Sequence, residues 1–319
     1  MNQFAPWALL AALLVAGCAE NNPSPDDGGS NPDADGDVDA DVPEDVPEDV
    51  PEDVPGDMPE DVPEDVPEDV PADGDGGSAA GCSIAGETTY GSPVTEAVTF
   101  TATTDSLAHH GTLFIPEAGG TFATVILLHK MCDTRAEWTL EAANLAMALA
   151  QRGFLVLAYD LRGFGETNAG GTLNLCAGEP PESEFAKMTD DLIDAIDWLG
   201  TRSEADLDCL GVAGSSIGAN VAFIAGDGEP RIDTVVMLSP GLDYFGLQPL
   251  PHVPGFEPRE SLMMATTGDT YSADTVTTLD GDAAHATPHV YDGDAHGTLI
   301  FVEQDGSMDE VVDWFSDRL

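Results

Sequence analysis

A tandem repeat with the sequence Val-Pro-Glu-Asp sets the strongest limit on what this chain can fold into. The repeat runs from Val42 to Asp73 in eight units, with proline at every fourth position. Each proline removes a backbone donor and biases the preceding residue toward extended backbone. The surrounding segment from Asn21 to Gly81 has no aromatic residue, so it has too little apolar surface to form a core. We predict a disordered acidic spacer over residues 18–81 and one folded domain over residues 82–319.

The charge of the chain excludes one class of partner. The sequence has 9 Lys and Arg against 60 Asp and Glu, which gives a formal net charge of −51. Residues 1–81 contain 23 acidic and no basic residues, and the remaining 238 residues contain 37 acidic and 9 basic residues. Because so negative a surface repels a phosphate backbone, we expect no nucleic-acid partner.

The N-terminus has the pattern of an export signal. The apolar stretch from Phe4 to Ala16 is 13 residues long, which is too short to span a bilayer but suits the apolar region of a signal peptide. Val15-Ala16-Gly17-Cys18 resembles the lipobox of bacterial lipoproteins. The resemblance implies that residues 1–17 are removed and that Cys18 carries the lipid that binds a membrane. We therefore expect a lipid-anchored protein of the bacterial cell envelope. Ala19 in place of Asp favours the outer membrane or cell surface over the inner membrane.

Short apolar runs alternate with helical patterns through the predicted domain, which is typical of βαβ units. The predicted strands are 97–103, 111–115, 123–128, 155–159, 210–214, 234–238, 262–266 and 289–291. The predicted helices are 137–151, 184–201, 219–225 and 307–319. We therefore predict an α/β fold with a mostly parallel eight-stranded sheet and helices on both faces.

The pattern Gly214-Ser215-Ser216-Ile217-Gly218 stands between a predicted strand and a predicted helix. A strand, a sharp turn and a helix form the context of a nucleophile elbow, in which the central serine hydroxyl lies above the sheet edge. The two glycines allow the turn without Cβ clashes. A Gly- and Ser-rich turn without chemistry is the alternative, because so short a pattern recurs by chance.

Further motifs in the same order resemble the α/β-hydrolase family, and within it the dienelactone-hydrolase-like branch, over nearly all of residues 97–319. They are Leu127-Leu128-His129-Lys130-Met131, Trp138, Asp160-Leu161-Arg162-Gly163-Phe164-Gly165, Ser239-Pro240-Gly241-Leu242-Asp243-Tyr244 and Asp294-Ala295-His296-Gly297. The resemblance implies a serine hydrolase that needs no cofactor. Lys130 departs from the family pattern, because it stands where glycine is usual in the loop that supplies an oxyanion donor.

The resemblance and the chain order Ser, Asp, His imply the catalytic roles. Ser216 is the predicted nucleophile, and His296, in the loop after the last strand, is the predicted base. For the acid that orients His296 we favour Asp269, which follows the seventh strand. Asp274 and then Asp243 are the alternatives. Asp274 also suits the first turn of a helix, where a carboxylate complements the helix dipole.

The predicted oxyanion donors are the backbone N–H groups of Met131 and Ile217. His129 is expected to have a structural role, and we expect the surface or a loop for His109, His110 and His252. The segment 241–260 carries aromatic and aliphatic side chains among several prolines. It either walls an acyl or alkyl pocket or is an ordinary connection, and the sequence does not separate the two.

The cysteines also agree with export, since disulfides persist outside the cytoplasm. Cys132 and Cys176 fall on predicted loops at one edge of the sheet, so we favour that pair, which leaves Cys82 with Cys209. Four buried thiols are the alternative. No CxxC or HExxH pattern is present, so we predict no metal site. The run 31–37 resembles half of a calcium loop but lacks the acidic ligand at its twelfth position.

Together these features predict a membrane-tethered serine hydrolase that cleaves carboxylic esters or lactones of small substrates through an acyl-enzyme. Two alternatives remain open from the residues. One is a surface-binding lipoprotein that keeps the scaffold without the activity, which Lys130 would favour. The other is a peptidase or acyltransferase that uses the same three residues.

Overall fold

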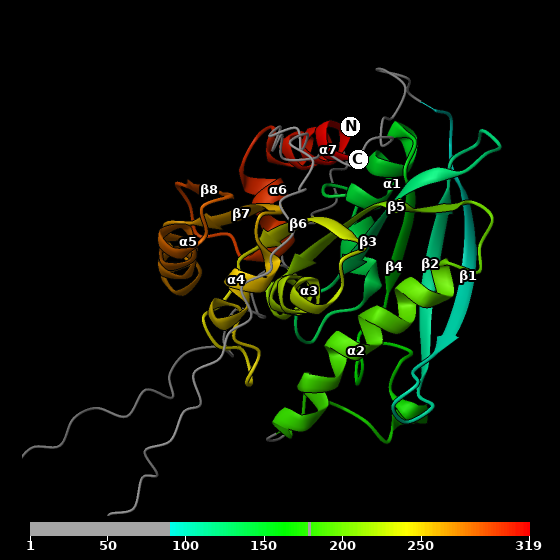
Figure 1. Cartoon of the computed structure of the whole chain (residues 1–319), viewed down its shortest axis with the longest axis horizontal. Coiled ribbons are helices and arrows are strands. Elements are labelled where there is room, and N and C mark those ends of the chain that lie inside the picture. Colours follow the sequence, from blue (N-terminus) through cyan, green and yellow to red (C-terminus); the bar gives the residue numbers. More distant parts are fainter. Residues whose placement is uncertain (1–89, 178–179) are drawn as a thin grey trace, which may run out of the picture. The chain divides into compact units, whose positions relative to one another are not determined.

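A computed structural model describes residues 90–177 and 180–319, which belong to one compact unit (Figure 1). The predicted signal peptide 1–17, the predicted lipid site Cys18, the acidic spacer and Cys82 lie outside these residues. In the described ranges, no helix combines the length and the apolar character needed to cross a membrane.

Eight strands form one sheet in the order β1-β2-β4-β3-β5-β6-β7-β8 (Figure 1). Every predicted strand overlaps one of them: β1 (Val94–Thr101), β2 (Ala108–Ile115), β3 (Phe122–Leu128), β4 (Leu155–Tyr159), β5 (Ala205–Ser215), β6 (Ile232–Leu238), β7 (Glu260–Thr266) and β8 (Ala286–Tyr291). The central strands are buried on both faces, which explains their nearly continuous apolar sequence.

The sheet is mixed, which corrects the prediction of a mostly parallel sheet. Strand β2 pairs antiparallel with both β1 and β4, whereas the pairs from β4 through β3, β5, β6 and β7 to β8 are parallel. A short turn joins β1 to β2, closed by the hydrogen bond from Ala102 N–H to Leu107 O. So short a connection forces antiparallel pairing, whereas a parallel pair needs a long crossover.

Helices cover both faces of the sheet (Figure 1). One core cluster contains residues of α1 (Leu145–Arg152), α6 (Ile300–Glu303) and α7 (Ser307–Arg318), and the other contains residues of α2 (Glu182–Leu199), α3 (Ile217–Gly228), α4 (Val253–Phe256) and α5 (Thr270–Asp282). Four 3₁₀ turns complete the described elements: η1 (Arg135–Thr139), η2 (Ala169–Gly171), η3 (Leu250–His252) and η4 (Gly297–Leu299).

The helix predicted over 137–151 is wrong in its first half. The chain instead forms η1, becomes extended at Leu140, and starts α1 only at Leu145. The side chain of Asn144 accepts the Met147 N–H at 3.0 Å and caps the new helix. This interruption turns Glu137 inward, and its side chain is buried.

Parallel pairing brings the C-terminal ends of β3, β5, β6, β7 and β8 to one edge of the sheet. Loops that follow parallel strands at such an edge form the usual position for a ligand site in open α/β sheets. Every predicted catalytic residue follows one of these strands.

Candidate active site

Ser216 occupies a sharp turn between β5 and α3. Its backbone has φ 54° and ψ −116°, a conformation that a non-glycine residue adopts only when its surroundings impose it. A Cβ on Gly214 would overlap the Gly218 carbonyl, and a Cβ on Gly218 would overlap the carbonyls of Leu128 and His129. Both flanking positions therefore require glycine, and the turn has the geometry of a nucleophile elbow.

His296 lies between β8 and η4 and contacts a carboxylate. Its Nδ1 is 2.7 Å from Oδ2 of Asp269, the N-cap residue of α5. The structure brings neither alternative to His296: Asp274 is exposed on α5, and exposed Asp243 accepts bonds from Gly246 and Gln248. Of the three carboxylates considered, Asp269 is the one that can orient the imidazole.

Side-chain hydroxyls hold the Asp and His loops together. Thr266 Oγ1, at the end of β7, donates to Ala295 O at 2.8 Å, one residue before His296. The Gly297 N–H donates to Ser239 Oγ at 2.9 Å, and a Cβ on Gly297 would overlap Ser215 Oγ. The backbone that carries His296 thus packs against the residue beside Ser216.

The electrostatic surroundings keep Asp269 ionised. Burial is the largest influence on its pKa and would raise it, but the hydrogen bond and charge of His296 act in the opposite direction. With the hydroxyls of Ser272 and Ser239, they hold the pKa of Asp269 below its ordinary value. A carboxylate that stays negative can hold the Nδ1–H tautomer of His296 and stabilise an imidazolium.

Tyr244 brings a phenol to the nucleophile. Its hydroxyl donates to Ser239 O at 3.4 Å and lies within hydrogen-bonding reach of Ser216 and Ser272. Burial raises the pKa of Tyr244 to about 12, although its hydroxyl neighbours act in the opposite direction. The phenol therefore stays protonated, and its O–H is a donor beside Ser216.

The segment 241–260 is anchored on α3. The buried side chain of Asn220 donates to Gly241 O at 2.7 Å and to Leu247 O at 2.8 Å, and it accepts the Gly241 N–H at 3.1 Å. Phe245 stacks on Phe185 with ring centroids 4.4 Å apart. Because it presents Tyr244 to Ser216, this segment forms a wall beside the nucleophile.

The peptide between Lys130 and Met131 has a fixed orientation. His129 Nδ1 donates to Lys130 O at 2.7 Å, while His129 Nε2 accepts the Leu161 N–H at 2.9 Å. Burial lowers the pKa of His129, so the ring is neutral with its proton on Nδ1. Because a trans peptide is planar, fixing Lys130 O on one side also fixes the direction of the Met131 N–H on the other.

Lys130, the departure from the family pattern, belongs to a partly buried ion pair that the sequence did not predict. Its Nζ donates to Glu137 Oε1 at 2.9 Å and to Asp133 Oδ2 at 2.7 Å, and its backbone N–H donates to Glu137 Oε2 at 2.8 Å. Desolvation would lower the pKa of Lys130, but the two carboxylates raise it above its ordinary value. The lysine is therefore charged and paired with both carboxylates.

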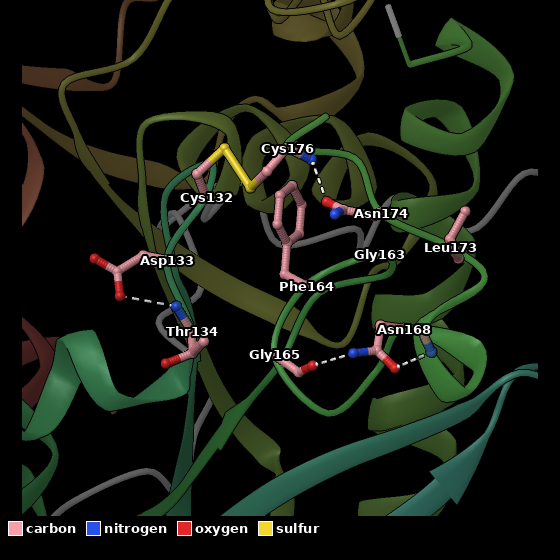
Figure 2. A pocket seen from close by; sticks show the side chains of 11 residues that line it. Cys132, Asp133, Thr134, Gly163, Phe164, Gly165, Asn168, Leu173, Asn174 and Cys176 are labelled. Atoms are coloured by element: carbon pink, nitrogen blue, oxygen red, sulfur yellow. Dashed lines mark hydrogen bonds between the residues drawn. A yellow bond between two sulfur atoms is a disulfide. The ribbon is translucent and has the colours of Figure 1, made fainter. Parts of the chain in front are cut away.

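The expected disulfide Cys132–Cys176 is present, and it tethers the loop that contains Lys130 and Met131 (Figure 2). It joins the residue after Met131 to the segment that follows the turn at Gly163–Gly165. Next to the disulfide lies a cavity of about 260 Å³, lined by Asp133, Phe164 and Asn174 among others, which does not include the predicted triad. Cys209 is also disulfide-bonded, and Cys82, its expected partner, lies outside the described residues.

His109, His110 and His252 lie apart from the Asp269–His296 pair. His109 is fully buried in β2, where its Nε2 lies 3.2 Å from Asp191, which corrects the expectation of a surface or loop position. Its ring stacks on Phe100 and lies edge-on to Tyr159, which explains a burial that the polar sequence His109-His110 does not suggest. His110 is half-buried in β2, and His252, in η3, contacts Asp227. Within residues 90–177 and 180–319, no cluster of three or more side chains could hold a metal ion.

Comparison with known proteins agrees with this fold. The sequence model of the family described as serine aminopeptidase, S33, matches residues 120–275. An uncharacterised 31.7 kDa protein of Escherichia coli is 28% identical over 125 residues, which are 39% of this chain and 40% of that protein. A polyketide transferase of Penicillium crustosum is 29% identical over 140 residues, 43% of this chain and 42% of that protein. The matches thus span about two fifths of the curated relatives' length.

Solved structures extend the likeness to most of the described residues. A 2,6-dihydroxy-pseudo-oxynicotine hydrolase has TM-score 0.57 and 18% identity, covering 71% of this chain and 68% of that one. An esterase of Pyrococcus furiosus has TM-score 0.56 and 18% identity over 71% and 91% of the two chains. Dienelactone hydrolase of Anabaena variabilis has TM-score 0.54 and 19% identity over 72% and 97%.

The strand-turn-helix element at Ser216, the Asp269–His296 contact and this strand order are together typical of the α/β-hydrolase fold. The chain has the α/β-hydrolase fold, and dienelactone hydrolase and esterases are among the structures it resembles.

Proposed function

We propose that this protein is a serine hydrolase that cleaves carboxylic esters or lactones of small substrates. The observation that carries the proposal is the Asp269–His296 contact of 2.7 Å in a loop packed beside the elbow of Ser216. Acyl transfer requires a nucleophile, a base, a group that orients the base, and oxyanion donors. Each of these has a candidate at the same edge of the sheet.

In the proposed reaction Ser216 Oγ attacks the substrate carbonyl while His296 Nε2 accepts its proton. Asp269 holds the proton on His296 Nδ1 and stabilises the imidazolium. The N–H groups of Met131 and Ile217 bind the oxyanion. The imidazolium then protonates the leaving alkoxide, and in the second step His296 deprotonates a water that attacks the acyl-enzyme and releases the acid. The proposed nucleophile, base, orienting carboxylate and oxyanion donors all belong to this chain.

The role of Lys130 bears on the binding-only alternative. Lys130 was the one feature in favour of a scaffold without activity. Its ion pair with Glu137 and the bond from His129 to its carbonyl hold the loop despite the missing glycine. A lysine at this position is therefore compatible with an ordered donor at Met131, and the enzymatic function is favoured.

The test is hydrolysis of short-chain p-nitrophenyl esters by the full-length chain in detergent, beside S216A of matched folding by circular dichroism. We expect turnover by the wild type, none above background by S216A, and labelling of the wild type alone by a fluorophosphonate. A folded wild type that neither turns over esters nor reacts with the probe contradicts the proposal.

Peptide-bond cleavage and acyl transfer are the second candidate, because a matched family is described as a serine aminopeptidase and a relative is named a polyketide transferase. Product analysis separates the three activities. An active enzyme supplied with an ester, a peptide and an added alcohol yields mainly free acid from the ester if it is an esterase. It yields cleaved peptide if it is a peptidase, and a new ester of the added alcohol if it is an acyltransferase.

We also propose that the enzyme is tethered to the bacterial cell envelope through Cys18, by way of the acidic spacer. This proposal rests on the sequence. Metabolic labelling with radioactive palmitate should mark the wild type and leave C18S unmarked, and fractionation should move C18S out of the membrane pellet. Equal labelling of both proteins contradicts it.

A further inference from the structure

Glu137 is a buried group that contacts three loops of the proposed site. Its side chain is fully buried, yet sequence patterns gave it no role. Oε2 accepts the backbone N–H of Lys130 at 2.8 Å. Oε1 accepts from Lys130 Nζ at 2.9 Å, from Ser215 Oγ at 3.0 Å and from Thr298 Oγ1 at 2.9 Å.

These donors come from three separate parts of the proposed site. Lys130 precedes the oxyanion donor Met131, Ser215 precedes the nucleophile, and Thr298 lies two residues after His296. Ser215 and Thr298 are themselves buried. A buried carboxylate satisfied by four donors is stable only while all four hold their positions.

We propose that Glu137 is a positioning residue that locks the oxyanion loop, the nucleophile elbow and the histidine loop into one arrangement. This inference rests on the proposed function. Lys130 places a positive charge 2.9 Å from this buried carboxyl group, which gives a reason for a lysine where the family usually has glycine. Glu137 itself does not touch the substrate.

The decisive variants are E137Q and the double variant K130M/E137Q. A glutamine has one accepting oxygen, so when that oxygen accepts the Lys130 N–H its amide must donate, and the hydroxyls of Ser215 and Thr298 must reverse and accept. The charge-assisted hydrogen bonds of the carboxylate are then lost. E137Q also leaves the ammonium without its buried partner, which lowers stability. The double variant removes both charges, so its Tm should recover, but the carboxylate contacts that hold the three loops together are still missing.

We expect kcat for a p-nitrophenyl ester to fall about 100-fold in E137Q, with KM within about threefold, since a displacement near 1 Å at a reacting group has about that effect. The double variant should recover Tm but not kcat. A purely structural ion pair predicts that kcat recovers with Tm, and that result would overturn the proposal.

The matched control is E229Q. Glu229 is also a buried carboxylate bound to an arginine, Arg231, but it follows α3 at the opposite edge of the sheet. E229Q should lower Tm and leave kcat unchanged. An equal loss of kcat in E229Q would contradict a specific role for Glu137.

Hydrogen exchange separates this inference from the proposed function. In E137Q and the double variant, amides of 129–134 and of 296–299 should exchange faster together, although these segments are far apart in sequence. If the wild type proves inert toward esters and fluorophosphonate, the proposed function fails, while coupled exchange still supports the lock. Unchanged exchange in either segment overturns it.

Discussion

Replacing Asp269 with asparagine should remove most of the activity without unfolding the protein. The carboxylate lies 2.7 Å from His296 Nδ1, so in the transition state it faces an imidazolium. Two unit charges about 4 Å apart interact by about 4 kcal/mol at an effective dielectric constant near 20. Because the His296 side chain is 38% exposed, water screens part of this energy. We take about 3 kcal/mol, which corresponds to roughly a 100-fold to 1,000-fold loss of kcat.

The assay is initial-rate hydrolysis of p-nitrophenyl acetate and butyrate at pH 8, with kcat and KM determined separately for wild type, D269N and D274N. D274N is the matched control, because Asp274 is the same residue type on the same helix but is exposed away from His296. We expect D274N to resemble the wild type. If D269N keeps more than about a tenth of the wild-type kcat, or if D274N is the impaired variant, the assignment of Asp269 is refuted.

Four further results are expected. The pKa of Asp269 is held below its ordinary 3.8. Its contribution to stability is therefore present above about pH 4 and is lost as the pH falls through the lower folded-state pKa. In urea titrations, the difference in unfolding free energy between wild type and D269N should narrow from pH 7 to pH 3. The Cys132–Cys176 disulfide closes a separation of 44 residues, so C132S/C176S should lose about 4 kcal/mol in the chain-entropy estimate, measured by urea denaturation, and a loss below about 1 kcal/mol contradicts it. Y244F loses one hydroxyl donor beside Ser216, so kcat should fall about fivefold, and an unchanged kcat removes Tyr244 from the site. Eight of the nine Lys and Arg are paired with carboxylates and the ninth, Arg259, donates to backbone carbonyls, so none is left to attract an anionic substrate. At low salt, kcat/KM should therefore be at least tenfold lower for mono-p-nitrophenyl succinate than for the uncharged butyrate. Equal values would refute this charge selectivity.

Local patterns were sufficient for the strands and for the elbow. Parallel strands buried on both faces leave continuous apolar runs, and all eight such predictions overlap strands of the sheet. The glycines around Ser216 could be placed because a backbone approach that excludes a Cβ leaves a direct trace in the sequence. The direction of β2 relative to β1 could have been inferred from their short connection, whereas the antiparallel pairing of β2 with β4 leaves no trace in the composition of either strand. His109 was misplaced for a similar reason, since burial beside a carboxylate depends on the neighbouring strands and helix.

The failure of one helix prediction explains why Glu137 could not be found from the sequence. In a continuous helix over 137–151, Glu137 would be an acidic residue of the first turn, where it complements the helix dipole and faces water. The chain instead breaks at Leu140 and folds 135–139 as a 3₁₀ turn, which points Glu137 into the interior toward Lys130, Ser215 and Thr298. The unusual lysine and the buried glutamate are therefore two halves of one feature. Considered alone, Lys130 suggests that the predicted oxyanion loop is disrupted. Together with Glu137, it gives this loop a second contact that holds it, besides the bond from His129 to Lys130 O.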